Sequence, residues 1–534
     1  MHLYKKQGLG FVSLFVAAGL LAALATVGTY YTQKKAATQN STSPASLKAE
    51  VKPNSFQDLN GVAWIYTTQH DHTFADITKS LDKLNDSGFR VVGIYSPYYG
   101  DKNKWLGCDP LDFYSTSPQS GSIDDWKKLV EEAHKRNMKV VTYFSNVFID
   151  KESDYFKIAA LQYKTGDRTS REVSTFQWTT DPTAPLPSPS VGPPKNTPRT
   201  DEGYEHRTQW KYSPEAGAYY WSVWGEAGLD FNKPGARAEI EKLTKYWLDT
   251  GVDGFMWDDG HSAMNFQGKE REVFKYHMAD LAKTYTPNDK WITFESTQGD
   301  QGDAYLKFGL TSWFNFADVD NMNDYTGITL YDDNADSLED AFKKTDFARS
   351  NGQTTHAWAS SDPYPSEALM RVQEAALLAG AGILYGTPEY DIYLQWPKDI
   401  RDNWDEVLRT VNANKALLPS ASRTRVPTNP DPKIYAMQRT SKDGSQTVLL
   451  IYNFNKIQTD ISVQLEASGL SLCQIPYDLY TKQPAPTITK DVYTIKLPPY
   501  GFRMLQVKKS KDGACSKNQV PEEMGPNKEA RNVM

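Results

Sequence analysis

From about residue 59 the chain alternates between short runs rich in β-branched and aromatic residues and longer stretches with helical periodicity. Runs of the first kind are typical of buried strands, whereas apolar residues spaced three and four positions apart are typical of helices with one buried face. Eight segments have the strand pattern: 61–68, 90–97, 139–147, 254–259, 290–296, 311–316, 355–360 and 382–387. The alternation predicts a parallel sheet covered by helices, and eight repeats predict an α/β fold of the (β/α)8, or TIM, barrel type.

Two of the intervening stretches carry clear helix signals. Residues 122–137 begin with Ser122, which is expected to be the N-cap, and Asp125 stands three positions later as the acid of a capping box. Residues 234–251 begin with Pro234, which suits the first turn of a helix. Both stretches lead into segments with the strand pattern, as a barrel requires.

Segments of different composition interrupt and follow the barrel pattern. The Pro-rich run 181–202 lies in a connection too long for an ordinary loop, so residues 148–225 are expected to form an insertion within a barrel spanning 59–420. Residues 421–508 alternate with period two between turn residues, which predicts a C-terminal antiparallel β-sandwich domain. Two flanking segments are small or polar in composition: a linker at 36–58 and a tail, expected to be disordered, at 509–534.

The first 35 residues have the pattern of a targeting segment. Lysines precede the uncharged stretch 8–31, and Ala23-Leu24-Ala25 has the form of a cleavage site. The whole stretch is also close to the roughly 20 residues that span a bilayer. A cleaved signal peptide and an uncleaved membrane anchor are therefore both open. Either predicts an exported protein that is secreted, periplasmic or anchored to a membrane and facing outside.

Composition narrows the classes of partner. The 59 Lys and Arg against 66 Asp and Glu residues give a net charge of −7 without a long basic run, which argues against nucleic acid as a partner. Aromatic residues make up 13% of the chain, and they serve either as core or as platforms on which sugars stack. Three cysteines have neither zinc spacing nor the count of a disulfide framework, although one bridge is left open. No cofactor or metal is predicted. The sequence has no dense oxygen-ligand loop of the EF-hand type, which argues against calcium, but a calcium ion is left open.

Three acidic residues follow strand-like segments. Asp258 comes after the fourth, Glu295 after the fifth and Asp362 just beyond the seventh. Reactive groups of TIM barrels lie at the carboxyl ends of the strands, so these acids are expected to converge on one cleft. Paired carboxylates that flank a sugar cleave glycosidic bonds, because one protonates the leaving oxygen while the other attacks the anomeric carbon or activates water. The alternative is that such acids cap the following helices.

The order of these motifs resembles that of the α-amylase family, glycoside hydrolase family 13, from about residue 59 to 508. Residues 228–259 resemble the family's D-L-N-x-x-x-P helix and its G-V-D-G-F-R-x-D strand, and residues 291–296 resemble the strand with the fifth-strand acid. Residues 359–363 stand where the family has N-H-D, and residues 374–390 resemble the last helix and eighth strand.

The resemblance implies a role for each acid and shows departures around them. Asp258 matches the nucleophile, Glu295 the general acid/base, and Asp362 the aspartate that holds substrate hydroxyls. Where the family has an arginine two residues before the nucleophile this chain has Met256, and Ser361 replaces a histidine. The first-region Asp and His fall either on Tyr143 and Phe148 or, in the other alignment, on Thr142 and Val147.

Further residues are candidates for substrate binding: Tyr98, Tyr143, Trp257, His261 and Ser361. For Tyr143, Trp257 and Trp358, which lie on barrel strands, packing is the alternative to a role as a sugar platform. Trp221 and Trp224 are further stacking candidates, and His356 is expected to be a packed core residue.

Together these features predict an exported retaining α-glycosidase or transglycosidase that acts on α-linked glucan or related oligosaccharides. The Asp258 and Glu295 carboxyl groups are then expected to lie about 5–5.5 Å apart. The alternative is a non-catalytic ectodomain of the same fold that binds a carbohydrate or a partner. Action on an unusual sugar or on a polysaccharide is a third reading, and the oligomeric state is not predicted.

Overall fold

The computed structural model describes residues 55–67, 72–187, 208–257, 281, 284–285, 290–294, 334–350, 356–359 and 366–508, apart from short gaps at 102, 105–106, 146, 224, 388, 466–467 and 471. The chain divides into two units, 1–51 and 52–534, and every described residue belongs to the second. The expected targeting segment, the sixth strand at 311–316 and the tail lie outside the described residues.

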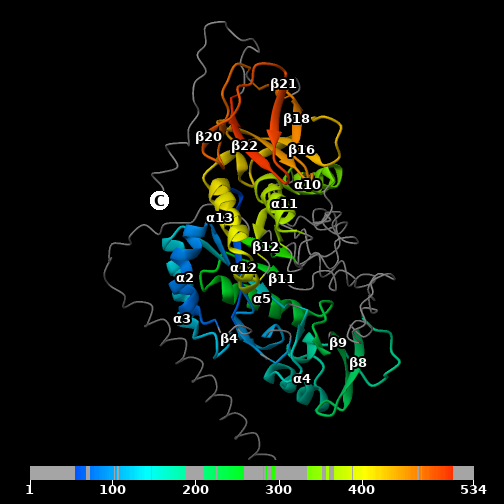
Figure 1. The fold of residues 1–534 in the computed structure, drawn as a ribbon. Coiled ribbons are helices and arrows are strands. Elements are labelled where there is room, and N and C mark those ends of the chain that lie inside the picture. Colours follow the sequence, from blue (N-terminus) through cyan, green and yellow to red (C-terminus); the bar gives the residue numbers. More distant parts are fainter. Residues whose placement is uncertain are drawn as a thin grey trace, which may run out of the picture. The chain divides into compact units, whose positions relative to one another are not determined.

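A parallel sheet of seven strands forms the centre of the fold (Figure 1). Its strands are β1 (Val62–Tyr66), β2 (Val91–Tyr95), β5 (Lys139–Phe144), β11 (Gly254–Trp257), β12 (Trp291–Phe294), β13 (His356–Trp358) and β14 (Leu384–Gly386). The order across the sheet is β12-β11-β5-β2-β1-β14-β13. This is the order of a TIM barrel whose sixth strand, expected between β12 and β13, falls outside the described residues. The structure therefore confirms the predicted fold class.

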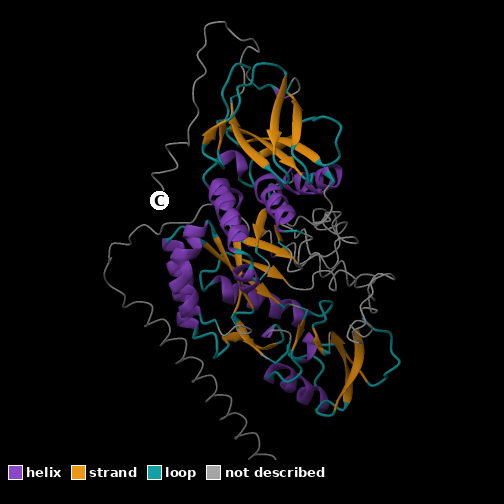
Figure 2. Cartoon of the chain, in the orientation of Figure 1, coloured by secondary structure: helices purple, strands orange, loops and turns teal. Residues whose placement is uncertain are grey.

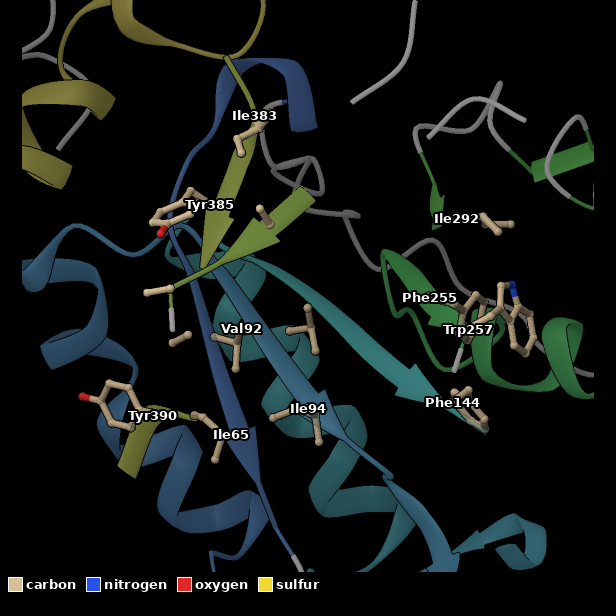
Figure 3. Packing of buried hydrophobic residues seen from close by; sticks show 14 of the residues in the cluster. Ile65, Val92, Ile94, Phe144, Phe255, Trp257, Ile292, Ile383, Tyr385 and Tyr390 are labelled. Atoms are coloured by element: carbon tan, nitrogen blue, oxygen red, sulfur yellow. The ribbon is translucent and has the colours of Figure 1, made fainter. Parts of the chain in front are cut away.

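Side chains alternate between two faces of this sheet. Inward-facing residues, such as Trp64 and Met256, form one buried cluster inside the barrel. Their neighbours, such as Ile65 and Phe255, belong to a second cluster that includes the covering helices (Figure 3). Within the described ranges, the helices that cover the sheet are α2 (Phe74–Ser87), α3 (Ile123–Lys135), α5 (Pro234–Leu248), α10 (Ala335–Ser350), α11 (Glu367–Gly380), α12 (Tyr390–Gln395) and α13 (Lys398–Asn412). None of the helices in the described part of the chain is long and apolar enough to cross a bilayer.

The helix signals in the sequence have the expected local structure. The Ser122 hydroxyl caps α3, and the Asp125 carboxylate accepts a hydrogen bond from the Ser122 main-chain N–H, so the capping box is complete. Pro234 is the first residue of α5, where its missing N–H has no intrahelical partner to lose.

The described residues of the insertion after the third barrel strand form a small sheet and the helix α4 (Asp154–Lys164) (Figures 1 and 2). Its antiparallel strands are β6 (Phe148–Ile149), β7 (Trp178–Thr179), β8 (Thr208–Ser213), β9 (Ala218–Val223) and β10 (Glu226–Gly228). The last strand therefore extends three residues beyond the expected boundary at 225. A hairpin of β3 (Tyr98–Gly100) and β4 (Pro110–Thr116), which the sequence pattern did not predict, follows β2.

The C-terminal region is an antiparallel β domain, as predicted. One sheet contains β15 (Ser422–Arg425), β16 (Ile434–Thr440), β17 (Thr447–Asn453), β19 (Tyr477–Asp478), β20 (Gln483–Pro484) and β22 (Phe502–Val507), and a second pairs β18 (Thr459–Gln464) with β21 (Val492–Leu497). Alternate residues of both sheets meet in one apolar cluster, which includes Leu449, Ile461 and Ile495. In this domain Cys473 is disulfide-bonded, whereas Cys108, between β3 and β4, forms no disulfide and its sulfur accepts a hydrogen bond from the Ser96 hydroxyl (3.1 Å).

A fully buried arginine joins the C-terminal domain to the barrel. The Arg439 guanidinium, on β16, donates hydrogen bonds to the Gly380 carbonyl (2.7 Å) and the Leu418 carbonyl (2.6 Å). Gly380 is the last residue of α11, and terminal carbonyls of a helix have no intrahelical partner. Arg439 thus satisfies groups that burial would otherwise leave unpaired.

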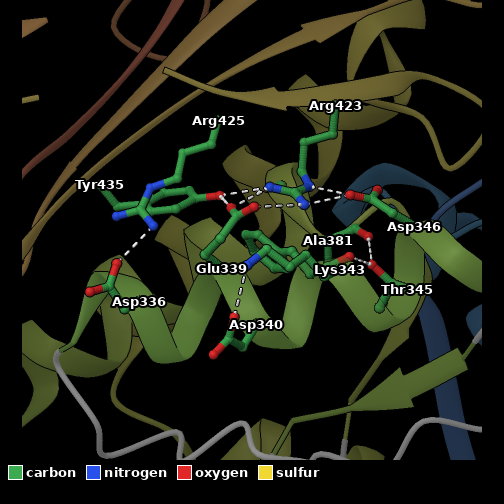
Figure 4. A network of polar contacts seen from close by, with 12 residues as sticks. Asp336, Glu339, Asp340, Lys343, Thr345, Asp346, Ala381, Arg423, Arg425 and Tyr435 are labelled. Carbon is green, nitrogen blue, oxygen red and sulfur yellow. Dashed lines mark hydrogen bonds and ion pairs between the residues drawn. The ribbon is translucent and has the colours of Figure 1, made fainter. Parts of the chain in front are cut away.

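A second contact between the same parts is a network of charges around Arg423, which is on β15 (Figure 4). Its guanidinium donates to Glu339 on α10 (2.6 Å) and to the Tyr435 hydroxyl (2.9 Å), and it also pairs with Asp346. The Tyr435 hydroxyl donates to the same Glu339 carboxylate at 2.5 Å. Only 3% of the Arg423 side chain is exposed, so removing it leaves Glu339 charged, buried and short of partners.

We expect Arg423→Met to lower the free energy of unfolding by about 3 kcal/mol, because it breaks a buried ion pair on one side only. Urea unfolding followed by tryptophan fluorescence measures the change. The matched control is Arg425→Met, which removes the partner of the exposed Asp336 and should cost about 1 kcal/mol or less. Equal losses in the two variants would contradict the role given to Arg423.

Candidate active site

Aromatic side chains fill the barrel interior near the carboxyl ends of its strands. Tyr66, Tyr95 and Tyr143 are register partners on three adjacent strands, β1, β2 and β5. The Tyr66 and Tyr95 rings stack with centroids 3.8 Å apart and planes at 10°, and the Tyr95 and Tyr143 rings lie 4.7 Å apart at 41°. Burial raises the pKa of the Tyr66 hydroxyl well above its ordinary value, so this group stays protonated and able to donate.

The row of tyrosines continues into an apolar side chain. Met256 on β11 is the register partner of Tyr143, is fully buried, and belongs to the same interior cluster. The family motif has a permanently charged arginine at this position. In this chain the row therefore ends in a thioether that can neither neutralise a carboxylate nor donate a hydrogen bond to a sugar.

Trp257, expected as a candidate for substrate binding, faces the other way. Its indole is fully buried on the helix side of the sheet, beside Phe255 (centroids 5.3 Å apart) and Phe144 (6.1 Å) (Figure 3). Successive residues of a strand point to opposite faces, so the inward Met256 forces Trp257 outward. This placement corresponds to packing rather than to a sugar platform.

Tyr98 is also buried, and its ring has no exposed face on which a sugar could stack. Its hydroxyl donates to the Cys108 carbonyl (2.7 Å) and accepts from the Ser145 main-chain N–H (3.3 Å). Ser145 directly follows β5, so Tyr98 joins the β3–β4 connection to the end of a barrel strand. Its role in the structure is to hold this connection in place.

The other candidates on described residues have mixed placements. Tyr143 is 7% exposed in the barrel interior, and Trp358 is partly buried against the same cluster. Trp221, the stacking candidate of the insertion, is 1% exposed and therefore packed. Tyr66 and Tyr95 were not singled out from the sequence. Each lies two residues before the end of a strand-like segment, and this position is the signal that could have identified them.

His356 is a core residue, as expected. It lies on β13 in the barrel interior, where the Trp64 Nε1–H donates to its Nε2 at 3.1 Å. Complete burial lowers its pKa to about 3, so the imidazole is neutral at physiological pH. Its ring contacts Trp291 of β12 edge to face with centroids 5.5 Å apart, which places side chains of the two terminal strands of the described sheet in contact.

A cluster of charges ties the β3–β4 connection to the insertion. The Lys104 ammonium donates to Asp150 (2.8 Å) and to Glu226 (3.2 Å), and Lys151 pairs with the same Glu226 carboxylate (3.0 Å). Asp109 is 2% exposed beside this cluster. Burial, reinforced by the negative charges of Glu226 and Asp150 and opposed by the lysines, raises the pKa of Asp109 to about 7.

Five of the predicted site residues lie outside the described residues: Asp258, Glu295, Asp362, His261 and Ser361. The stacking candidate Trp224 does so as well. Across the described ranges, no group of His, Cys, Asp or Glu side chains is arranged to hold a metal ion.

Two family models match the chain in the order of its domains. Residues 50–301 match the model described as the catalytic domain of α-amylase, and residues 425–504 match that of the C-terminal domain of maltogenic amylase. The chain belongs to the α-amylase family. The family assignment thus confirms the resemblance seen in the sequence, and the second match coincides with the antiparallel β domain.

Curated relatives from this family share part of the chain. An α-glucosidase of Culex pipiens is 29% identical over 211 residues, which is 39% of this chain and 32% of the relative. An oligo-1,6-glucosidase of Parageobacillus thermoglucosidasius is 29% identical over 211 residues, 39% of this chain and 33% of the relative. The matched region thus spans about a third of the length of these relatives.

Solved structures extend the likeness to most of the chain at the level of fold. Amy13B of Eubacterium rectale has a TM-score of 0.63 at 16% identity and covers 88% of this chain and 100% of its own. An α-amylase from Geobacillus thermoleovorans, complexed with acarbose, has a TM-score of 0.63 at 14% identity, with coverages of 86% and 100%. These similarities establish a shared α-amylase-type fold.

The raised pKa of Asp109 predicts a pH-dependent stability. The folded state holds the proton up to about pH 7, whereas the unfolded chain releases it near pH 4, so this residue's contribution to stability falls as the pH rises between those values. Relative to Asp109→Asn, the wild-type free energy of unfolding should therefore decrease by about 3 kcal/mol from pH 4 to pH 7. Denaturant unfolding of both proteins across this range tests the expectation, and parallel curves would refute it.

Proposed function

We propose that this α-amylase family member is a retaining glycoside hydrolase or transglycosidase acting on α-linked glucan oligosaccharides, with Asp258 as nucleophile and Glu295 as general acid/base. The supporting observation is the register of β11 and β12, in which Met256 pairs with Thr293 and Trp257 with Phe294. Continued by one residue beyond the described strands, the same register would pair positions 258 and 295.

Strand alternation supports the same assignment. On β11 the inward residue is Met256, and on β12 Trp291 is inward whereas Ile292 faces the helices. A period of two then predicts that positions 258 and 295 are both inward. Neighbouring strands lie roughly 4.8 Å apart, which suits the about 5–5.5 Å between the carboxyl groups of a retaining pair.

This pair accounts for both halves of the reaction. The Asp258 carboxylate would attack the anomeric carbon while Glu295 gives its proton to the departing glycosidic oxygen, so that one C–O bond forms as another breaks. Glu295 would then remove a proton from water or a sugar hydroxyl, whose oxygen attacks the anomeric carbon and releases Asp258. On β13 His356 and Trp358 face inward, so the same alternation favours an inward Asp362, which would bind substrate hydroxyls.

The second candidate function is a non-catalytic protein that binds a carbohydrate or a partner. The observation that favours it is Met256, which is buried and apolar where the family motif has the arginine that steadies the nucleophile. Retention of all three acids favours the enzyme, because binding alone does not require a carboxylate pair on adjacent strands.

We also propose that the protein is exported, either with a cleaved signal peptide or with residues 8–31 as an anchor. The disulfide at Cys473 supports this location, because disulfides persist in oxidising compartments and are rare in the cytosol.

We expect hydrolysis of activated α-glycosides or α-glucan oligosaccharides by the wild-type protein, and a loss of about 10³-fold or more in Asp258→Asn and Glu295→Gln. Product release from a panel of such substrates measures the effect, and NMR of the first product reports retention of the anomeric configuration. Turnover absent from all three proteins would favour the binding function. Full activity in both variants would refute the assigned roles.

The missing arginine predicts a second property of the active site. Without a cation at position 256, the nucleophile should ionise at higher pH than it would beside an arginine. We therefore expect Met256→Arg to move the acid limb of the kcat/KM profile down by about one pH unit, whereas the volume-conserving Met256→Leu should leave it in place. Profiles of the two variants that coincide would show that position 256 does not act on the nucleophile.

A further inference from the structure

An exposed pair of tyrosines lies on the β8–β9 hairpin of the insertion. Tyr212 is 55% exposed, and Tyr219 is half-buried beside it. The two residues are register partners, and their ring centroids are 5.2 Å apart with the planes inclined at 65°. Neither residue has a part in the catalytic proposal. Large aromatic side chains exposed next to each other often mark a binding surface.

Among the described side chains, the face of the hairpin that carries this pair has no charged residue. Its other members are Trp210 on β8, which is half-buried, and Trp221 and Val223 on β9, which are buried, because alternate residues share a face and the register pairs them across the strands. The part of this face that a ligand can reach is therefore the two tyrosine rings with their hydroxyl groups, and such uncharged side chains suit a neutral, hydroxylated ligand. They offer nothing to an anionic polymer, which needs Lys or Arg.

The opposite face of the hairpin fixes the pair in place. Tyr220 is buried there, with its ring 4.7 Å from Phe156 of α4 and 6.4 Å from Trp178 of β7. At the turn, the Ser213 hydroxyl accepts a hydrogen bond from the Ala216 N–H (3.1 Å), and Gly217 adopts a left-handed backbone with φ of 63°. Little backbone entropy of the hairpin is therefore left to lose when a ligand binds.

We propose that Tyr212 and Tyr219 form a binding platform for α-glucan chains, separate from the catalytic residues; the choice of ligand rests on the proposed function. A phenol ring packs against the C–H face of a pyranose, and its hydroxyl exchanges hydrogen bonds with those of the sugar. Successive rings of an α-1,4-glucan are inclined to one another, as the two tyrosine rings are, whereas a β-1,4-glucan is a flat ribbon that suits coplanar rings. The platform would hold a glucan polymer on the surface of the protein while a chain end of the polymer enters the barrel.

Native electrophoresis of the full chain in gels containing amylopectin tests this platform. The wild-type protein should be retarded by amylopectin but not by barley β-glucan. Tyr212→Ala/Tyr219→Ala should weaken the apparent affinity about tenfold, the loss expected from removing two stacking rings. Tyr212→Phe/Tyr219→Phe keeps the rings and should bind amylopectin. Ile457→Ala removes a side chain that is 68% exposed in the C-terminal domain and is the matched surface control.

Circular dichroism establishes that each variant is folded, and the exposed single variant Tyr212→Ser provides a milder change with the same expected direction. Wild-type protein that migrates unretarded, or equal retardation of the wild type and the double alanine variant, would overturn the platform. Hydrolysis of a short maltoside is measured in parallel and should be unchanged in the double variant. Retardation that depends on the tyrosines without any hydrolysis would refute the proposed function and leave the platform standing.

Discussion

Neighbouring barrel strands are held in parallel register by main-chain hydrogen bonds, and the register decides which side chains share the barrel mouth. A slip of one residue on β11 would exchange the environments of Met256 and Trp257, because the side-chain period of a strand is two. The row of rings Tyr66–Tyr95–Tyr143 and the edge-to-face contact of His356 with Trp291 both depend on the observed pairing. The proposed pairing of positions 258 and 295 follows from the same constraint. The strand register thus determines both the packing of the barrel interior and the proposed position of the two carboxylates.

Much of the architecture could be predicted from local pattern. The barrel strands, the capped start of α3 at Ser122 and the antiparallel C-terminal domain all produce periodicities that a reader of the sequence can detect. The β3–β4 hairpin could not be predicted, because its three-residue strand has shifts in register and leaves no clear alternation. The Arg423–Glu339 pair also left no signal, since its partners are 84 positions apart and meet only in the tertiary fold.

The candidate site was predicted less completely than the fold. The carboxyl ends of the predicted strands identified the three acids and Tyr143 as candidates. Aromatic character alone, however, could not distinguish a ring that faces the barrel interior from one that packs against the helices. For that reason Trp257 and Tyr98 were predicted to bind substrate although both are fully buried, whereas Tyr66 and Tyr95 in the barrel interior were not predicted. The three acids themselves lie outside the described residues, so their roles rest on the family and on extrapolated register.

The buried Arg439 has a consequence for any attempt to divide the chain. Its guanidinium completes the hydrogen bonding at the end of α11, and α11 leads directly into β14, the eighth barrel strand. An excised barrel would expose the carbonyls that this arginine satisfies, just ahead of the strand that pairs with β1. Recombination between relatives is therefore constrained, because a foreign C-terminal domain that buries the same carbonyls must bring a hydrogen-bond donor of equal reach to them.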